Sequence, residues 1–189
     1  MAKKLTTTQL IAIGALAALY TILSLPGAII AGLTGMWLFS AIANIVVIGI
    51  MYPLVPLLFK RVGAVTLWAL IVGIIFIPLP LGGPPGFLPK VVYMAFWGLF
   101  ADFVYLLFKR SEKISAILIG ATQIGLGGII TVYLWNLLGA PKLAAQSTTI
   151  ASYPFIIAGS IVGGIMGFIA YLIYKKARNT LIIRRIQGE

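Results

Sequence analysis

The sequence predicts an all-α, polytopic membrane protein with six transmembrane helices. Hydrophobic residues make up 61% of the 189 residues, charged residues only 9%, and the mean hydropathy is +1.12. A soluble domain of this length buries far less apolar surface, so lipid is the expected solvent. Hydrocarbon offers the backbone no hydrogen-bond partners, so only helix bundles and closed barrels cross it. The long apolar runs lack the alternation of barrel strands.

Six apolar stretches have the length of about 17–25 residues that a helix needs to cross about 30 Å of hydrocarbon. They lie near residues 9–25, 35–58, 63–80, 87–108, 114–138 and 151–174. The first stretch leads to Pro26-Gly27 without a convincing small-residue cleavage site, so we interpret it as a retained helix rather than a signal peptide. Together the six stretches and their short connections form one transmembrane domain that spans residues 1–189.

Basic residues are concentrated in alternate connections. Of the 14 lysines and arginines, 12 fall on one side of the predicted topology: Lys3, Lys4, Lys60, Arg61, Lys109, Arg110, Lys113, Lys175, Lys176, Arg178, Arg184 and Arg185. Only Lys90 and Lys142 fall on the other side. By the positive-inside rule, this asymmetry predicts a multi-pass protein of the cell membrane with both termini in the cytoplasm. The connections near 26–34, 81–86 and 139–150 then face outward.

The net charge of +11 is explained by this sorting, so it does not indicate nucleic-acid binding. The basic segment 175–185 is expected to lie next to the membrane, where each positive charge is attracted to anionic lipid headgroups by about 1 kcal/mol. The alternative for this segment is a docking surface for a cytoplasmic partner.

The composition excludes most catalytic chemistry. The chain has no His and no Cys, so haem, zinc, copper and iron–sulfur sites, His-dependent nucleophiles and disulfides are not available to it. Its three acids, Asp102, Glu112 and Glu189, are far apart in the sequence. The phosphate-binding pattern G-x-x-x-x-G-K-[ST] is missing as well. We therefore expect no enzyme activity, no metal and no cofactor.

Two helical stripes of polar and aromatic residues are candidates for a ligand site. Trp37, Ser40 and Asn44 recur at i, i+3 and i+7, and Lys90, Tyr93 and Trp97 do the same, so each set can face one cavity. With Asn136 and Tyr153 in the outer halves of the last two stretches, they suggest an outward-facing pocket.

Each of these residues also has a structural interpretation. Trp and Tyr gather at membrane interfaces for reasons of solvation, and Asn44 could form an interhelical hydrogen bond. Lys90 could extend its ammonium group to water, or it could hold a carboxylate or phosphate of a ligand.

A proline-rich run occupies residues 78–89, Pro-Leu-Pro-Leu-Gly-Gly-Pro-Pro-Gly-Phe-Leu-Pro. Prolines and glycines at this density exclude a helix. The run is expected either to form a stiff cap over the outer mouth of the bundle or to be a compact turn, with Pro89 near the start of the next helix.

Asp102 is the one acid within a predicted span, where a charge costs about 2.5–3.5 kcal/mol at the centre of the bilayer. It lies seven residues before Lys109, on the same helical face. We expect an ion pair with Lys109, or with Lys60 or Arg61. Proton or sodium coupling and contact with another subunit are the alternatives.

Small residues mark the places where helices can approach closely. Gly159, Gly163 and Gly167 recur at i+4 in the last stretch, and the preceding stretch is similarly rich in glycine around 120–128. These two helices are therefore predicted to pack against each other. In the first stretch, Gly14 and Ala18 form a small-xxx-small pair that suits contact with a further helix, either of a partner or of the bundle itself.

The chain resembles the substrate-binding S components of energy-coupling factor transporters. The resemblance covers the six-span topology and two stretches of sequence. One is Ala-Leu-Ala-Ala-Leu-Tyr-Thr-Ile-Leu-Ser-Leu-Pro at 15–26. The other is Gly-Phe-Leu-Pro-Lys-Val-Val-Tyr-Met-Ala-Phe-Trp-Gly-Leu-Phe-Ala-Asp at 86–102, which is similar to the family's fourth helix.

This resemblance implies capture of a vitamin, vitamin precursor or similar micronutrient in the outer half of the chain. Import would then depend on a transmembrane T subunit and separate cytoplasmic ATPases. The family's small-residue motif on the first helix contacts the T subunit, and the matching positions here are Gly14, Ala15 and Ala18, with Gly in place of the commoner first Ala. The family's substrate contacts favour Lys90, Tyr93, Trp97, Asn136 and Tyr153, beside the Trp37 and Asn44 of the second stretch.

Three other functions are compatible with the sequence. A stand-alone secondary transporter or channel would need a coupling site, for which Asp102 is the available residue. A lipid-modifying enzyme lacks a visible nucleophile and base, and an assembly subunit would bind no ligand. Because outward acids are missing from the sequence, we favour a neutral or anionic aromatic ligand.

Overall fold

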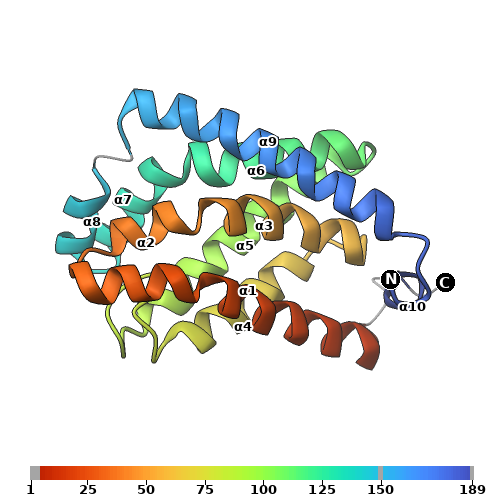
Figure 1. Cartoon of the computed structure of the whole chain (residues 1–189), viewed down its shortest axis with the longest axis horizontal. Helices are drawn as coiled ribbons and strands as arrows, with labels where there is room; N and C mark the ends of the chain where they lie inside the picture. The colour runs from red at the N-terminus through yellow and green to blue at the C-terminus, as the bar shows by residue number, and fades with distance from the viewer. Residues whose placement is uncertain (1–4, 149–150, 188–189) are drawn as a thin grey trace.

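The computed structural model describes residues 5–148 and 151–187, apart from the side chains of Trp37 and Leu38. Its regular elements are all helices (Figure 1). They are α1 (Thr7–Thr34), α2 (Trp37–Ala43), α3 (Ile45–Phe59), α4 (Ala64–Phe76), α5 (Pro89–Phe108), α6 (Glu112–Gly125), α7 (Gly127–Leu137), α8 (Pro141–Ser147), α9 (Tyr153–Ala177) and α10 (Leu181–Gln187). The all-α class is thereby confirmed for the described residues.

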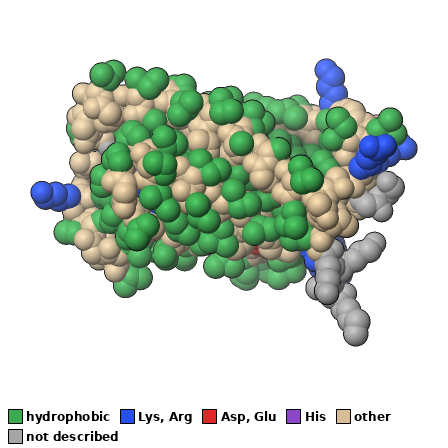
Figure 2. All heavy atoms as spheres, turned by 90° about the horizontal axis from the view of Figure 1, so that it is seen from below, with side chains coloured by type: hydrophobic (Ala, Val, Ile, Leu, Met, Phe, Trp, Pro, Cys, Tyr) green, Lys and Arg blue, Asp and Glu red, His purple; other side chains and the backbone are tan. Residues whose placement is uncertain are grey.

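The helices run back and forth along the long axis of one bundle. Both chain ends and α10 lie at one end, which we call the terminal end, together with the connections at 60–63 and 109–111 (Figure 1). The opposite end, the loop end, carries α8, the irregular segment 77–88 and the connection between α1 and α2. The side chains of the basic residues that stand out in Figure 2 lie at these two ends, and hydrophobic side chains cover the surface between them.

Three of the described helices are long and apolar enough to cross a membrane: α1, α5 and α9. The bent pair formed by α6 and α7 would make a fourth, while α3 and α4 are apolar but have only 15 and 13 residues. Large hydrophobic side chains such as Ile11, Ile161 and Leu107 are exposed along the bundle. An apolar surface of this extent is compatible with a protein that is surrounded by lipid.

Helix α1 is longer than predicted. The sequence suggested an outer turn at 26–34, but α1 continues through Pro26 as far as Thr34 and ends at Gly35, which has a φ of 66°. Its buried face, including Gly27 and Ala31, extends beyond the proline. A side chain at Gly27 would overlap the Asn44 amide. Close packing between α1 and α2 therefore stabilises the helix where local propensity predicts its end.

Two predicted spans are interrupted. The stretch 35–58 divides at Asn44 into α2 and α3, and the stretch 114–138 divides at Leu126 into α6 and α7, which are bent by 55° relative to each other. The outer connection 139–150 contains the short helix α8. Neither Asn44 nor Leu126 is a proline, and residues that flank both breaks line one cavity.

The predicted contact between the two glycine-rich helices is confirmed. A side chain at Gly120 of α6 would overlap the carbonyl oxygen of Gly163 in α9, and a side chain at Gly163 would overlap the carbonyl oxygen of Gly120. Gly167 faces Ala116, and Gly125 faces Ser160, in the same way. The backbones of α6 and α9 therefore touch along several turns, which requires residues without a Cβ atom.

Two charged side chains of α5 form hydrogen bonds to the two ends of α4. The Asp102 carboxylate of α5 accepts hydrogen bonds from the backbone N–H groups of Val65 (3.4 Å) and Thr66 (2.8 Å) and from the Thr66 hydroxyl (2.6 Å), all in the first turn of α4. The Lys90 ammonium group, also of α5, donates to the carbonyl oxygens of Phe76 (2.9 Å) and Leu79 (2.5 Å) at the other end of α4. The negative and positive groups thus complement the helix dipole of α4.

The prediction that Asp102 forms an ion pair with Lys109, Lys60 or Arg61 is therefore wrong. Among the described residues, the ion pair within 4 Å is between Lys60 and Glu112 at 3.5 Å, and it does not include Asp102. A carboxylate in an apolar bundle needs hydrogen-bond donors, and the free N–H groups of a helix N-terminus supply them without a second charge.

The C-terminal basic segment folds back on the terminal end. Helix α10 buries Ile183 and Ile186, and the Gln9 amide of α1 donates to the carbonyl oxygen of Ile186 at 2.8 Å. The amide of Gln187 donates to the carbonyl oxygens at the end of α3, Leu57 at 3.4 Å and Leu58 at 3.2 Å. These contacts leave Leu181 and Ile182 exposed beside the basic side chains.

Substitution of Gly163 tests the α6–α9 contact. We expect Gly163→Ala to lower the melting temperature of the purified protein, because overpacking typically costs about 1–3 kcal/mol. Gly164→Ala is the matched control, since a Cβ atom there meets Ile117 Cγ2 at an ordinary 3.6 Å. Equal melting temperatures of the two variants, measured by tryptophan fluorescence, would contradict the close contact.

Substitution of Asp102 tests the capping of α4. We expect Asp102→Leu to be strongly destabilising, because each buried N–H left without a partner costs about 1–3 kcal/mol, and Asp102→Asn to lose less because it keeps one acceptor. Glu112→Gln removes a half-exposed acid and should cost less than about 1 kcal/mol. The measurement is thermal unfolding in one detergent, and a Leu variant as stable as Glu112→Gln would refute the capping role.

Candidate functional site

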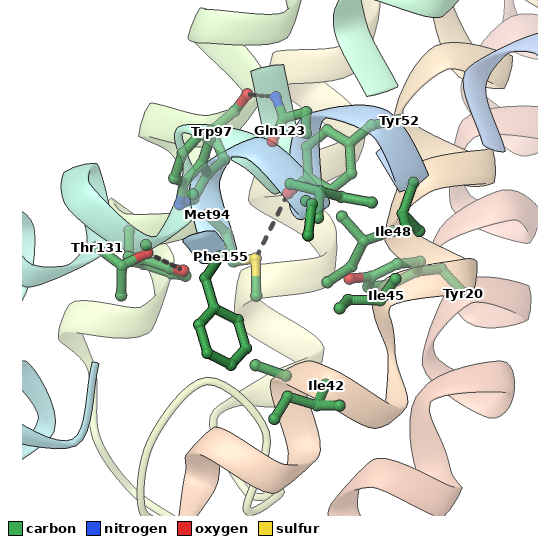
Figure 3. Close-up of a pocket in the computed structure, with 18 residues that line it drawn as sticks. Tyr20, Ile42, Ile45, Ile48, Tyr52, Met94, Trp97, Gln123, Thr131 and Phe155 are labelled. Atoms are coloured by element: carbon green, nitrogen blue, oxygen red, sulfur yellow. Dashed lines mark hydrogen bonds between the residues drawn. The ribbon is translucent and has the colours of Figure 1, made fainter. Parts of the chain in front are cut away.

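A cavity of about 290 Å³ lies inside the bundle, in the half nearer the loop end (Figure 3). It is bordered by residues of α1, α2, α3, α5, α6, α7 and α9. Its wall consists of Tyr20, Ala41, Ile42, Ile45, Ile48, Tyr52, Tyr93, Met94, Trp97, Gln123, Ile124, Gly127, Gly128, Thr131, Phe155, Ala158, Gly159 and Val162.

The two helix breaks make room for this cavity. Ile42 and Ile45 stand on either side of the break at Asn44, and Ile124 and Gly127 stand on either side of the break at Leu126. The chain bends by 55° at Leu126, so α7 diverges from the axis of α6. A side chain at Gly127 would meet no atom of the described residues within 4 Å, so this position contributes open space to the wall.

Aromatic rings form much of the wall and hold one another in place. Tyr93 stacks on Trp135 with ring centroids 4.4 Å apart, and it meets Trp97 edge-on at 6.3 Å. On the opposite side, Tyr20 and Tyr52 meet edge-on at 6.5 Å, and both pack against the buried Trp68 at 5.0 Å. Contacts of this kind fix the ring orientations, so the wall is preorganised for an apolar or aromatic ligand.

A few polar groups interrupt the apolar wall. The Gln123 amide nitrogen donates to the backbone carbonyl oxygen of Trp97 at 3.1 Å, and the hydroxyls of Tyr93 and Thr131 share a hydrogen bond of 3.0 Å. The Tyr52 hydroxyl donates to Met94 Sδ at 3.8 Å, as Figure 3 shows. The described residues of the wall include no Lys, Arg, Asp or Glu.

Of the seven residues predicted to bind substrate, Tyr93 and Trp97 line the cavity. They lie one turn apart on α5, on the stripe that their spacing predicted. The same helix also carries Lys90 and Asp102, which bond to the two ends of α4.

Lys90 and Asn44 are buried but do not line the cavity. Lys90 is fully buried, and its ammonium group is occupied by the carbonyl oxygens of Phe76 and Leu79. The Asn44 amide donates to the Ser40 hydroxyl at 3.4 Å and lies against Gly27 of α1. Lys90 therefore neither reaches water nor faces the cavity, because it is bonded to the end of α4. Asn44 forms its hydrogen bond within α2 rather than between helices, and it only packs against α1.

The remaining predicted ligand residues lie away from the cavity. Asn136 is exposed at the end of α7, and Tyr153 is 83% exposed at the start of α9, where an aromatic belt would lie. The side chain of Trp37 is outside the described part of the chain.

The cavity also contains residues that the sequence did not single out. Tyr20, Tyr52 and Gln123 lie deep inside apolar stretches, and each is at least 95% buried. Polar groups at such a depth are rare unless they have a partner or a function. A polar residue deep within an apolar stretch is a feature of the sequence that could have identified these three residues. The contacts among α1, α3 and α6 that bring them together cannot be predicted from the spacing of residues within one helix.

The predicted partner contact lies on an open face of α1. Ala15 and Ala18 are exposed, and a side chain at Gly14 would meet no atom of the described residues within 4 Å. Their neighbours on this face, Ile11 and Ile22, are more than 60% exposed. The small-residue stripe is therefore not used for packing inside the described bundle.

A second cavity of about 840 Å³ opens at the loop end. The proline-rich run is not helical, as predicted, and it borders this second cavity rather than the first. The Gly86 N–H donates to the Ile77 carbonyl oxygen at 2.7 Å, which closes the run into a compact loop, and Pro89 begins α5. Phe87 of this loop contacts Trp135 at 5.7 Å, so aromatic rings connect the two cavity walls.

Within the described residues, no group of three or more acidic side chains could hold a metal ion. No protein-family model matches the chain, and comparisons with curated proteins and with solved structures also find no match. The function therefore has to be inferred from the geometry of the cavity and of the surrounding surface.

Proposed function

We propose that this chain is the substrate-capture subunit of an energy-coupling factor importer in the cell membrane. It binds a vitamin, vitamin precursor or similar micronutrient in the aromatic cavity, and a transmembrane T subunit and separate ATPases drive delivery into the cell. The observation that carries this proposal is the cavity itself, a mostly apolar pocket with a few polar groups, placed in one half of an apolar helix bundle.

The distribution of charge supports an orientation with the cavity facing outward. Ten of the described basic residues lie at the terminal end, either within α6, α9 and α10 or directly after α3, α5 and α9. They are Lys60, Arg61, Lys109, Arg110, Lys113, Lys175, Lys176, Arg178, Arg184 and Arg185. Lys90 and Lys142 lie at the loop end. The positive-inside rule then places the terminal end in the cytoplasm and the cavity in the outer half.

Six membrane crossings fit this arrangement. Helices α3 and α4 alone are short, but α2 and α3 together cover residues 37–59. Turns at 77–80 extend α4 in the same way. Each of these two longer segments can then count as one crossing. Broken helices are tolerated in a membrane when the break is buried in protein or borders a cavity. The break at Asn44 is buried, and Ile124 and Gly127 on either side of the break at Leu126 line the cavity.

The open stripe of Gly14, Ala15 and Ala18 supports a partner in the membrane. A smooth, lipid-exposed helix face lets another helix approach closely, and close approach is the main source of helix association in lipid. In an importer of this type the partner would be the T subunit.

The geometry of Asp102 disfavours the alternative of a stand-alone secondary transporter. An ion-coupling acid must exchange a proton or a cation during the cycle, but both oxygens of Asp102 accept hydrogen bonds from the first turn of α4. The carboxylate is also outside the cavity wall. These contacts favour a structural role for Asp102 and transport driven by a partner.

Filling the cavity tests ligand capture. We expect the protein, gently purified from its native membrane, to carry a small molecule that native mass spectrometry detects. Ala41→Phe adds a ring to the cavity wall and should remove this molecule, whereas Ala43→Phe, at an exposed position of the same helix outside the wall, should retain it. If Ala41→Phe carries the molecule as well as Ala43→Phe does, the molecule is bound elsewhere and the proposal fails.

Blocking the α1 stripe tests the partner. We expect Ala18→Trp to abolish the ATP hydrolysis that co-purifies with the protein from native membranes, because the indole prevents close helix contact, and to leave the co-purified small molecule in place. Ile161→Trp, at a position of α9 that is 59% exposed, is the matched control and should keep the ATPase activity. ATPase activity that survives Ala18→Trp, or that is missing from the wild type, would argue against this docking face.

A further inference from the structure

We infer that the cavity selects an uncharged molecule of about two fused rings that carries an N–H donor. This inference rests on the proposed function, because it names the class of ligand for the same cavity. The sequence alone left neutral and anionic aromatic ligands open, and the arrangement of charges in the structure distinguishes between them.

The cavity offers no counter-charge to an ionised ligand. None of the described wall residues is basic or acidic. Lys90, the basic residue nearest in sequence to Tyr93, is bonded to two carbonyl oxygens of the chain, and Asp102 is bonded to N–H groups of α4. An anion without a partner in an apolar cavity loses its hydration and gains nothing comparable. A cation is attracted to the aromatic faces, but this gain is smaller than the cost of its dehydration. Neutral ligands are therefore favoured over charged ligands of the same shape.

Gln123 supplies an acceptor that the protein leaves unused. Its amide nitrogen must face the Trp97 carbonyl oxygen, which can only accept, so the orientation of the amide is set. The Gln123 carbonyl oxygen then accepts no hydrogen bond from the described residues, although the side chain is 95% buried and lines the cavity. A buried acceptor of this kind gains most from a ligand N–H or O–H group.

Tyr52 provides the complementary donor. Among the described residues, its hydroxyl bonds only to the thioether sulfur of Met94, at 3.8 Å, and sulfur is a weak acceptor. A carbonyl oxygen or ring nitrogen of a ligand would be a better partner. Gln123 and Tyr52 both line the cavity (Figure 3), so a ligand with an N–H group and an acceptor could meet both.

The size of the cavity indicates the size of the ligand. An engineered apolar cavity of about 150 Å³ holds one benzene ring, so a cavity of about 290 Å³ suits a molecule of two fused rings. The faces and edges of Tyr20, Tyr93 and Trp97 are suited to stacking and edge-on contacts with such rings.

The test uses three probes of one shape and different charge: 2-naphthamide (neutral), 2-naphthoate (negative) and 2-naphthamidine (positive). Binding to the full chain in nanodiscs at neutral pH is measured by quenching of tryptophan fluorescence and by the rise in melting temperature. We expect 2-naphthamide to bind at least about tenfold more tightly than either charged probe. Tighter binding of a charged probe, or no binding of 2-naphthamide, would overturn the inference.

Variants of Gln123 test whether the preference for the neutral probe depends on this residue. Gln123→Leu should weaken 2-naphthamide binding about tenfold, because the bound N–H loses its acceptor. Gln123→Glu should invert the preference toward 2-naphthamidine, since the new carboxylate pairs with the cation. Gln146→Leu, at the wall of the second cavity, is the matched control and should bind all three probes as the wild type does.

The preference of Gln123→Glu for the positive probe keeps the test informative if the Leu variant does not fold. Unchanged preferences in a folded Gln123→Glu variant, judged by its melting temperature without probe, would overturn the role of Gln123. If a charged probe binds best while a co-purified molecule still depends on Ala41, the ligand class is wrong and the capture function stands. If no probe binds and no molecule co-purifies, both proposals fail.

Discussion

The bundle depends on one electrostatic arrangement, in which two charged side chains of α5 interact with the two ends of the helix dipole of α4. Lys90 and Asp102 are about 18 Å apart along α5, close to the length of about 20 Å that the 13 residues of α4 span. In an apolar surrounding each charge needs a partner, and the free carbonyl and N–H groups at the two ends of α4 provide it. Gly98 lets the helices approach, since a Cβ atom there would lie 2.7 Å from the Cα atom of Thr66.

The same helix carries two of the site residues. Tyr93 and Trp97 of α5 line the cavity, whereas the side chains of Lys90 and Asp102 bond to the two ends of α4. The glycine contact between α6 and α9 holds the opposite wall together. Between these two pairs, α7 bends away from α6 by 55°, and residues on both sides of the breaks at Asn44 and Leu126 line the cavity.

Different parts of the bundle surface carry different kinds of side chain. Apolar side chains cover the middle, and basic side chains gather at the terminal end (Figure 2). The stripe of Gly14, Ala15 and Ala18 is smooth and open, whereas the glycines of α6 and α9 are buried against each other. A protein that receives a ligand from one side and an energy source from another needs such separate surfaces, and this separation is what supports the proposed capture role.

Composition and short-range spacing were enough to predict the all-helical class, the close contact of the glycine-rich pair and a shared helical face for Tyr93 and Trp97. Each of these depends on local apolar content or on the period of a helix. The passage of α1 through Pro26, the breaks within two spans and the partners of Asp102 were not predictable in this way. Nor was the meeting of Tyr20, Tyr52 and Gln123 around one cavity, because every one of these features is stabilised by contacts between segments far apart in the chain, and such contacts overrule local propensity.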